Sequence, residues 1–261
     1  MSEPAVIYEV QDRIGVITLN RPDNRNSMTP DLLEAFVAAT GRAAADEDLR
    51  CVVITGRGNC FSAGADFKSQ IQVPGEALEG HERSYQMYVP FLSVLDIEVP
   101  VIGALQGHAV GGGFGLALVC DVRVANQGSK YGANFTRIGL SPGMAISYLL
   151  PRLVGASRAA ELLYTGRLML GDEAAAMGLM SQAVEGDQVL EVAMDMARKI
   201  AGNAPMAVKL TKQVFLEGMG WDVREGAMRE AIAQAVTVES EDCKEGMAAL
   251  LGRREPDFKG R

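Results

Sequence analysis

The chain has 261 residues, of which 48% are hydrophobic and 22% charged, and its formal net charge is −8 at pH 7. This acidic balance argues against a nucleic-acid partner, because phosphate binding needs clustered lysine and arginine. The longest apolar stretch, residues 110–120, contains four glycines and falls short of the roughly 20 residues of a membrane helix, so we expect no membrane partner.

The cysteines and the N-terminal residues favour a cytoplasmic protein. MSEPAVIYEV has no basic segment followed by an apolar one, so we expect no secretory signal. Cys51, Cys60, Cys120 and Cys243 show no C-x-x-C spacing, and the chain has only two histidines. We therefore predict no metal site and interpret the cysteines as reduced, buried thiols.

Strands and helices alternate along the first part of the chain. Strands are predicted at residues 5–10, 14–20, 50–56, 99–105 and 122–125. A helix is expected to begin at Thr29-Pro30-Asp31, because Thr suits the N-cap and Pro the first helical position. The β-branched run at 50–56 is typical of a buried parallel strand. This order predicts an α/β fold with a mostly parallel sheet.

From about Ser157 onward the sequence reads as almost wholly helical. Helices are predicted to begin at Gly171 and to span residues 189–201, 205–217 and 223–238. We therefore predict an α/β core over residues 1–200 and a helical C-terminal region over residues 201–261.

Two glycine-containing segments follow predicted strands and carry the first functional signal. Residues 62–65 are small and follow the strand at 50–56, and the triplet Gly111-Gly112-Gly113 follows the strand at 99–105. At the carboxyl end of one parallel sheet, two such junctions can direct two backbone N–H groups at one oxygen, as in an oxyanion hole. The alternative is that the glycines only allow tight packing of helix against sheet.

Several blocks, in order, resemble the crotonase superfamily, which is the enoyl-CoA hydratase/isomerase family. They include ITLNRPDNRNSM, CVVITGRGNCFSAGADFK, VPVIGALQGHAVGGGFGLALVCDVRVA and ESEDCKEGMAALLGRREPDFKGR. The resemblance implies a crotonase-like fold of repeated ββα units with a C-terminal helical trimerisation region. It also implies an acyl-CoA thioester substrate, no cofactor beyond the coenzyme A of that substrate, and a homotrimer or a hexamer made of two trimers.

The resemblance also implies roles for individual residues. The N–H groups of Ala65 and Gly112 would form the oxyanion hole for the thioester oxygen. Residues implied to bind coenzyme A are Arg25, Asn26, Ser27, Ala63, Asp66 and Lys68, with Phe258 and Lys259 reaching it from a neighbouring subunit.

The sequence departs from the family at the positions that carry acid–base chemistry. Hydratases of the family have two glutamates that activate water, and the corresponding residues here are Gly115 and Phe135. Dienoyl-CoA isomerases have an aspartate at the position of Gly143. General acid–base steps contribute about 10²–10⁴-fold, so ordinary hydration is expected to be very slow. Phe135 would make the site drier and suited to a bulky apolar acyl chain.

Two hypotheses follow. The first is an enzyme with isomerase, decarboxylase, hydrolase or unusual hydratase chemistry, in which His81 or a tyrosine of a helix over residues 81–93 replaces the missing groups. His81, Tyr85, Tyr88 and Leu92 fall on one stripe of that helix, and the alternative for His81 is a solvated side chain. The second hypothesis is a non-catalytic acyl-CoA binding protein. His108 and Asp121 are expected to be structural.

Overall fold

A six-stranded sheet forms the centre of the computed structural model, which describes residues 3–66, 80–220 and 222–259. The strands, in spatial order, are β1 (Val6–Gln11), β2 (Ile14–Leu19), β3 (Cys51–Gly56), β5 (Val101–Leu105), β7 (Val122–Asn126) and β10 (Gln182–Val184). Only the first pair is antiparallel. β3 and β5 are buried along their whole length, as their continuous apolar sequences require. The predicted α/β class and mostly parallel sheet are confirmed.

A second, smaller sheet lies beside the first and was not predicted. Its strands, in order, are β4 (Cys60–Ser62), β6 (His108–Val110), β8 (Lys130–Gly132) and β9 (Met169–Leu170). Each has two or three residues, too few to show an alternating pattern. β9 and β10 also show that the expectation of an almost wholly helical chain after Ser157 was wrong, because both strands lie in that part.

The two strands of each repeating unit belong to different sheets. β3 is followed by β4, β5 by β6 and β7 by β8, so the chain passes from the large sheet to the small one before the next helical segment. This is the expected crotonase-like arrangement of ββα units. The glycine segments therefore follow the short strands β4 and β6, and not the long strands β3 and β5 directly as the sequence suggested.

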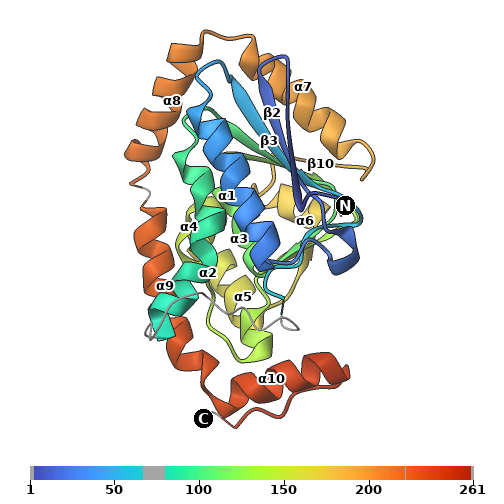
Figure 1. Ribbon diagram of the computed structural model, residues 1–261. Coiled ribbons are helices and arrows are strands. Elements are labelled where there is room, and N and C mark those ends of the chain that lie inside the picture. The colour runs from blue at the N-terminus through green and yellow to red at the C-terminus, as the bar shows by residue number, and fades with distance from the viewer. Residues whose placement is uncertain (1–2, 67–79, 221, 260–261) are drawn as a thin grey trace.

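Helices cover both faces of the large sheet (Figure 1). Their bounds are α1 (Pro30–Ala45), α2 (Gly80–Leu92), α3 (Gly112–Val119), α4 (Ile146–Val154), α5 (Ala156–Thr165), α6 (Gly171–Ala176), α7 (Val189–Ala201), α8 (Pro205–Gly218), α9 (Val223–Val238) and α10 (Glu241–Gly252). α7 packs on one face through Val189, Ala193 and Ala197, and the larger core on the other face includes residues of α1, α2 and α3. α7 and α9 have the predicted bounds. Thr29 occupies the N-cap of α1, but its hydroxyl contacts the Asp31 carboxylate at 2.5 Å and caps no backbone N–H.

The C-terminal helices follow one another along the outside of the molecule in Figure 1. α9 nevertheless packs against α2 and α4 of the same chain. Part of region 201–261 therefore packs on the α/β core. The division at residue 200 stays a prediction. None of the described helices has the length and apolar composition needed to cross a membrane.

The four cysteines are buried free thiols, as interpreted from the sequence. Burial raises the pKa of Cys51 and Cys120 to about 12 and that of Cys60 to about 11. A thiol with so high a pKa is not a nucleophile near neutral pH, so these side chains serve packing.

Candidate active site

The two glycine segments lie side by side, because β4 and β6 are neighbours in the small sheet and pair Cys60 with His108. A Cβ atom on Gly64 would stand 2.7 Å from the backbone N of Gly112 and 2.8 Å from the carbonyl O of Val110. Gly64 also has a φ of +78°. Only glycine satisfies both the contact and the left-handed backbone, which explains the small residues at this point of the sequence.

Two backbone N–H groups flank this contact. Gly112 is the first residue of α3, and N–H groups in the first turn have no partner within their helix. Ala65 forms a parallel bridge with Met28, in which the N–H of Met28 donates to the carbonyl of Gly64 at 2.8 Å. In a parallel bridge the bonded groups belong to the residues that flank Ala65, so its own N–H faces the other side.

Apolar side chains surround Gly112. A Cβ there would lie 2.7 Å from Sδ of Met28 and 3.6 Å from Cε1 of Tyr88, and both side chains are almost fully buried. In such surroundings a hydrogen bond to a charged oxygen is stronger than in water.

At two of the positions where the family resemblance places acid–base groups, neighbouring side chains already occupy the space. A Cβ on Gly115 would overlap Cγ of Met144 and lie 2.5 Å from its Cβ. A Cβ on Gly143 would lie 2.5 Å from the Tyr88 hydroxyl oxygen. Met144 and Tyr88 therefore occupy the room that side chains at residues 115 and 143 would need.

Phe135 lies next to the glycine triplet. It is the first residue of a 3-10 turn (Phe135–Ile138) after β8 and is only 6% exposed. Its Cζ atom lies 3.8 Å from the position of a Cβ on Gly111. The ring therefore adds to the apolar side chains around the triplet.

Tyr88 is the member of the predicted stripe that reaches the glycines. Its hydroxyl donates to Oε1 of Gln234 on α9 at 3.0 Å, and burial raises the pKa of the phenol well above its usual range. Tyr88 is therefore neutral at any ordinary pH. His81 is partly buried at the start of α2, seven residues earlier, which places it roughly 10 Å along the helix axis from Tyr88.

The turn around Arg25 is tied to the first glycine segment. The carbonyl of Arg25 accepts from the N–H of Ala63 at 3.0 Å. The Asn26 side chain is fully buried and donates to the carbonyls of Arg57 and Cys60 at 3.0 and 2.8 Å. The Ser27 side chain is also buried, and Arg25 is the exposed one of these three residues.

Other residues implied to bind coenzyme A are less closely linked to this turn. Asp66 is partly exposed at the end of the described segment, and Lys68 lies outside the described residues. Phe258 is 40% exposed beyond α10, and the N–H of Lys259 donates to Oδ1 of Asp242 at 2.6 Å. Within the chain, the backbone of Lys259 is thus held beside α10.

Both residues expected to be structural have partners in the fold. Nδ1 of His108 accepts from the N–H of Lys130 at 2.9 Å, and burial lowers the pKa of His108, helped by Lys130 and Arg25. The Asp121 carboxylate accepts from the N–H of Val101 at 2.7 Å and pairs with Lys212 at 2.9 Å.

Four residues around the site were missed from the sequence: Met28, Met144, Glu230 and Gln234. The two methionines lie outside regular helices and strands, where no periodicity applies. Glu230 and Gln234 are polar residues on a helix, which usually indicates solvent exposure, yet they are 6% and 3% exposed. Their spacing of four residues was the one available signal that they share a face.

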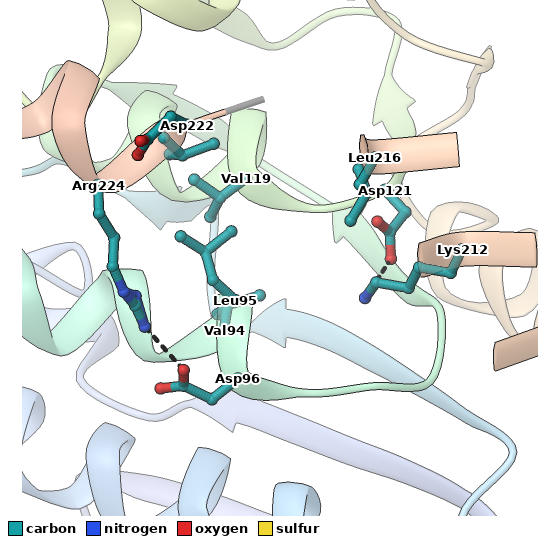
Figure 2. Close-up of a pocket in the computed structure, with 10 residues that line it drawn as sticks. Val94, Leu95, Asp96, Val119, Asp121, Lys212, Leu216, Asp222 and Arg224 are labelled. Atoms are coloured by element: carbon teal, nitrogen blue, oxygen red, sulfur yellow. Dashed lines mark hydrogen bonds and ion pairs between the residues drawn. The ribbon is translucent and has the colours of Figure 1, made fainter. Parts of the chain in front are cut away.

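Two hollows lie elsewhere, along α8. One has a volume of about 340 Å³. Apolar residues such as Val94 and Val119 lie between its Asp96–Arg224 and Asp121–Lys212 ion pairs (Figure 2). A more apolar groove of about 630 Å³ lies between α7 and α8. None of the described residues that were predicted for the site lines either hollow. Among the described residues, no group of three His, Cys, Asp or Glu side chains could hold a metal ion.

The chain is similar to known proteins over almost its whole length. A family model described as enoyl-CoA hydratase/isomerase matches residues 9–261. The short-chain-enoyl-CoA hydratase of Clostridium acetobutylicum is 33% identical over 98% of both chains. The (E)-benzylidenesuccinyl-CoA hydratase of Thauera aromatica is 33% identical over 98% of this chain and 99% of its own. The crystal structure of carnitinyl-CoA hydratase from Mycobacterium avium superposes with a TM-score of 0.87 at 31% identity, covering 100% of both chains.

Proposed function

This chain belongs to the enoyl-CoA hydratase/isomerase family of the crotonase superfamily, and on that premise we propose how it handles an acyl-CoA thioester. The carbonyl oxygen of the thioester binds between the N–H groups of Ala65 and Gly112. No cofactor is needed, because the coenzyme A is part of the substrate.

One observation carries this proposal: the fit of Gly64 against Gly112, with 2.7 Å between the position of a Cβ on the first and the backbone N of the second. The contact leaves the two amides flanking one point among apolar side chains. Such donors stabilise negative charge that develops on a carbonyl oxygen, which is worth several kcal/mol in acyl-transfer enzymes.

The residues near these amides favour reactions of the thioester enolate over the addition of water. At residue 115 there is no side chain, and the space is occupied by Met144. At residue 135 there is a buried phenylalanine. We propose double-bond isomerisation or loss of a carboxyl group next to the thioester, since both pass through an enolate that the two amides stabilise.

Coenzyme A would bind along the turn that joins Arg25 to Ala63. Arg25 would offer its exposed cation, whereas Asn26 and Ser27 would act by shaping the turn, because their side chains are buried within it. Asp66 and Lys68 would lie further along the same path. Phe258 and Lys259 would contribute from a neighbouring subunit.

A second candidate function is non-catalytic binding of acyl-CoA. The observation that favours it is the filling of the spaces at residues 115 and 143 by Met144 and Tyr88. In that case His81 would be a structural residue, consistent with its position two turns from the contact between Tyr88 and Gly112.

Mass spectrometry distinguishes these functions. Enoyl-CoA thioesters and a 2-carboxyacyl-CoA are incubated with the protein in D₂O enriched in ¹⁸O. Deuterium in the acyl chain without ¹⁸O, or loss of carbon dioxide, supports enolate chemistry, whereas gain of water contradicts it. Release of free coenzyme A indicates a hydrolase. Unchanged thioesters that bind tightly on the same sample support the binding protein.

We further propose that α8 carries the contact between subunits of a homotrimer or hexamer. None of its 14 residues is buried in the single chain. Its exposed apolar side chains include Met206, Leu210, Val214 and Phe215. Apolar surface of this kind is typical of an interface.

A further inference from the structure

One face of α9 binds a single segment of the chain through three polar side chains. Glu230, Gln234 and Thr237 follow one another at intervals of four and three residues, which places them on one face of the helix. All three contact the segment at 141–147, which follows the 3-10 turn at 135–138 and includes the start of α4.

Gln234 and Thr237 hold Ser141, the first residue of this segment. The Gln234 amide donates to the carbonyl of Ser141 at 3.2 Å and accepts from the Tyr88 hydroxyl at 3.0 Å. The Thr237 hydroxyl accepts from the N–H of Ser141 at 3.1 Å. Gln234 thus joins α2 to the 141–147 segment.

Glu230 holds the other end of the segment, at the start of α4. The Glu230 carboxylate accepts from the N–H of Ile146 at 3.1 Å and from both the N–H and the hydroxyl of Ser147. N–H groups in the first turn of a helix have no partner within it, and that end attracts negative charge. Glu230 is only 6% exposed, so the carboxylate is a buried cap provided by a different helix.

Between these two anchors the backbone adopts an unfavourable conformation. Met144 has a φ of +64° and Ala145 a φ of +57°, in the left-handed region that residues with a Cβ rarely occupy. Such residues persist only where the surrounding structure fixes them. The Glu230 carboxylate holds the N–H groups of the two residues that follow Ala145.

This left-handed turn positions the side chains that line the space beside the proposed oxyanion hole. Its Met144 side chain occupies the space next to Gly115, one helical turn after Gly112. Its Gly143 lies against the ring of Tyr88, whose Cε1 atom would lie 3.6 Å from a Cβ on Gly112. A change at the turn is therefore transmitted to both side chains that bound the region next to Gly112.

We propose that Glu230 is a positioning residue for the acyl group of the substrate: it holds the turn at Met144 and Ala145, and the turn keeps the Met144 side chain next to Gly115. The proposal rests on acyl-CoA binding at Ala65 and Gly112. Glu230 touches no substrate atom and sets acyl selectivity through Met144.

A double-mutant cycle tests this coupling. The dissociation constants of coenzyme A, butanoyl-CoA and octanoyl-CoA are measured by calorimetry for wild type, Glu230→Leu, Met144→Ala and the double variant. Each single substitution is expected to raise octanoyl-CoA affinity relative to coenzyme A at least fivefold, because the space beside Gly115 opens. In the double variant, Glu230→Leu should add less than twofold to Met144→Ala, because residues that act through one another are not additive. Additive effects, or unchanged selectivity in folded Glu230→Leu, would overturn the proposal.

A second readout needs no substrate and a milder substitution. Glu230→Gln keeps one acceptor oxygen, and the ¹³C-methyl NMR signal of Met144 is assigned by its loss in Met144→Leu. The signal should shift or broaden in Glu230→Gln and stay unchanged in Glu225→Gln, which removes a charge from an exposed position of the same helix. An unchanged Met144 signal in Glu230→Gln would overturn the proposal. If wild type binds no thioester more tightly than coenzyme A, acyl binding itself is wrong, while the NMR result still decides whether Glu230 holds Met144.

Discussion

Met144 occupies the space that a side chain at Gly115 would need, since a Cβ built on Gly115 would overlap Cγ of Met144. Both residues are fully buried. Gly115 and Met144 therefore form one packed arrangement: the glycine and the methionine fit each other, and neither can be changed alone without cost.

The first prediction concerns restoration of hydratase groups. Gly115→Glu with Phe135→Glu should give no gain in crotonyl-CoA hydration and should lower Tm, because overpacking a core costs about 1–3 kcal/mol. Addition of Met144→Ala should free the space and raise hydration at least tenfold above the parent, since acid–base groups contribute about 10²–10⁴-fold. The rate is measured as ¹⁸O incorporation. A folded double variant that hydrates as fast as the triple variant would show that Met144 is no obstacle.

The second prediction concerns the Tyr88 hydroxyl. Tyr88→Phe should lower stability by about 1 kcal/mol, the usual value of one hydrogen bond, and Tm by about 2–4 °C for a chain of this size. Acyl-CoA turnover should change less than tenfold, because the hydroxyl donates to Gln234. Tyr164→Phe, at a position 80% exposed, is the control. A loss of a hundredfold or more with Tm preserved would make Tyr88 a catalytic acid.

The sequence predicted the elements with long, regular patterns and missed those defined by contacts between distant segments. The apolar run at 50–56 and the helices at 189–201 and 223–238 could be predicted because burial repeats along each of them. β4, β6 and β8 could not, since three residues carry no period. Their pairing nevertheless brings the glycine segments together.

The candidate site divides in the same way. Small residues after strands left a local signal for the two glycine segments, and the family resemblance then implied Ala65 and Gly112 within them. Met144 and Glu230 were not, because their positions depend on a left-handed turn and on a helix more than 80 residues later in the chain. His81 was chosen for its chemistry, whereas the packing of α2 directs Tyr88 to Gly112.

The third prediction is a pH dependence of stability from Glu230. Burial raises the pKa of this carboxyl from 4.5 to about 7, against the lowering effect of the Ser147 and Ile146 donors. The folded state then binds this proton more tightly than the unfolded state, so the contribution is fully present below pH 4.5 and is lost as pH rises through 7. Linkage gives at most about 3 kcal/mol for such a shift.

Glu230→Gln should therefore remove a fall in stability between about pH 4.5 and 7. The free energy of unfolding in urea is measured from pH 4.5 to 8.5 for wild type and Glu230→Gln. The value for Glu230→Gln minus the value for wild type should increase as pH rises. Tyr88 and Ser147 are the polar groups that face Glu230 from α2 and α4, and neither titrates in this range. A difference that is constant with pH would show that folding does not raise the pKa of Glu230.

The fourth prediction concerns assembly. Leu210→Asp and Val214→Asp replace apolar side chains of α8 that are 53% and 64% exposed in the single chain. If these side chains are buried between subunits, each substitution places a charge in an apolar interface at a cost of several kcal/mol. Light scattering after size exclusion should then show a trimer or hexamer for wild type and smaller species for both variants.

Val37→Asp, at a residue of α1 that is 43% exposed, is the matched control and should assemble like wild type. Because the groove between α7 and α8 is apolar and open in the single chain, dissociation should also expose it to a hydrophobic dye. Unchanged assembly in both α8 variants would place the subunit contact on a different surface.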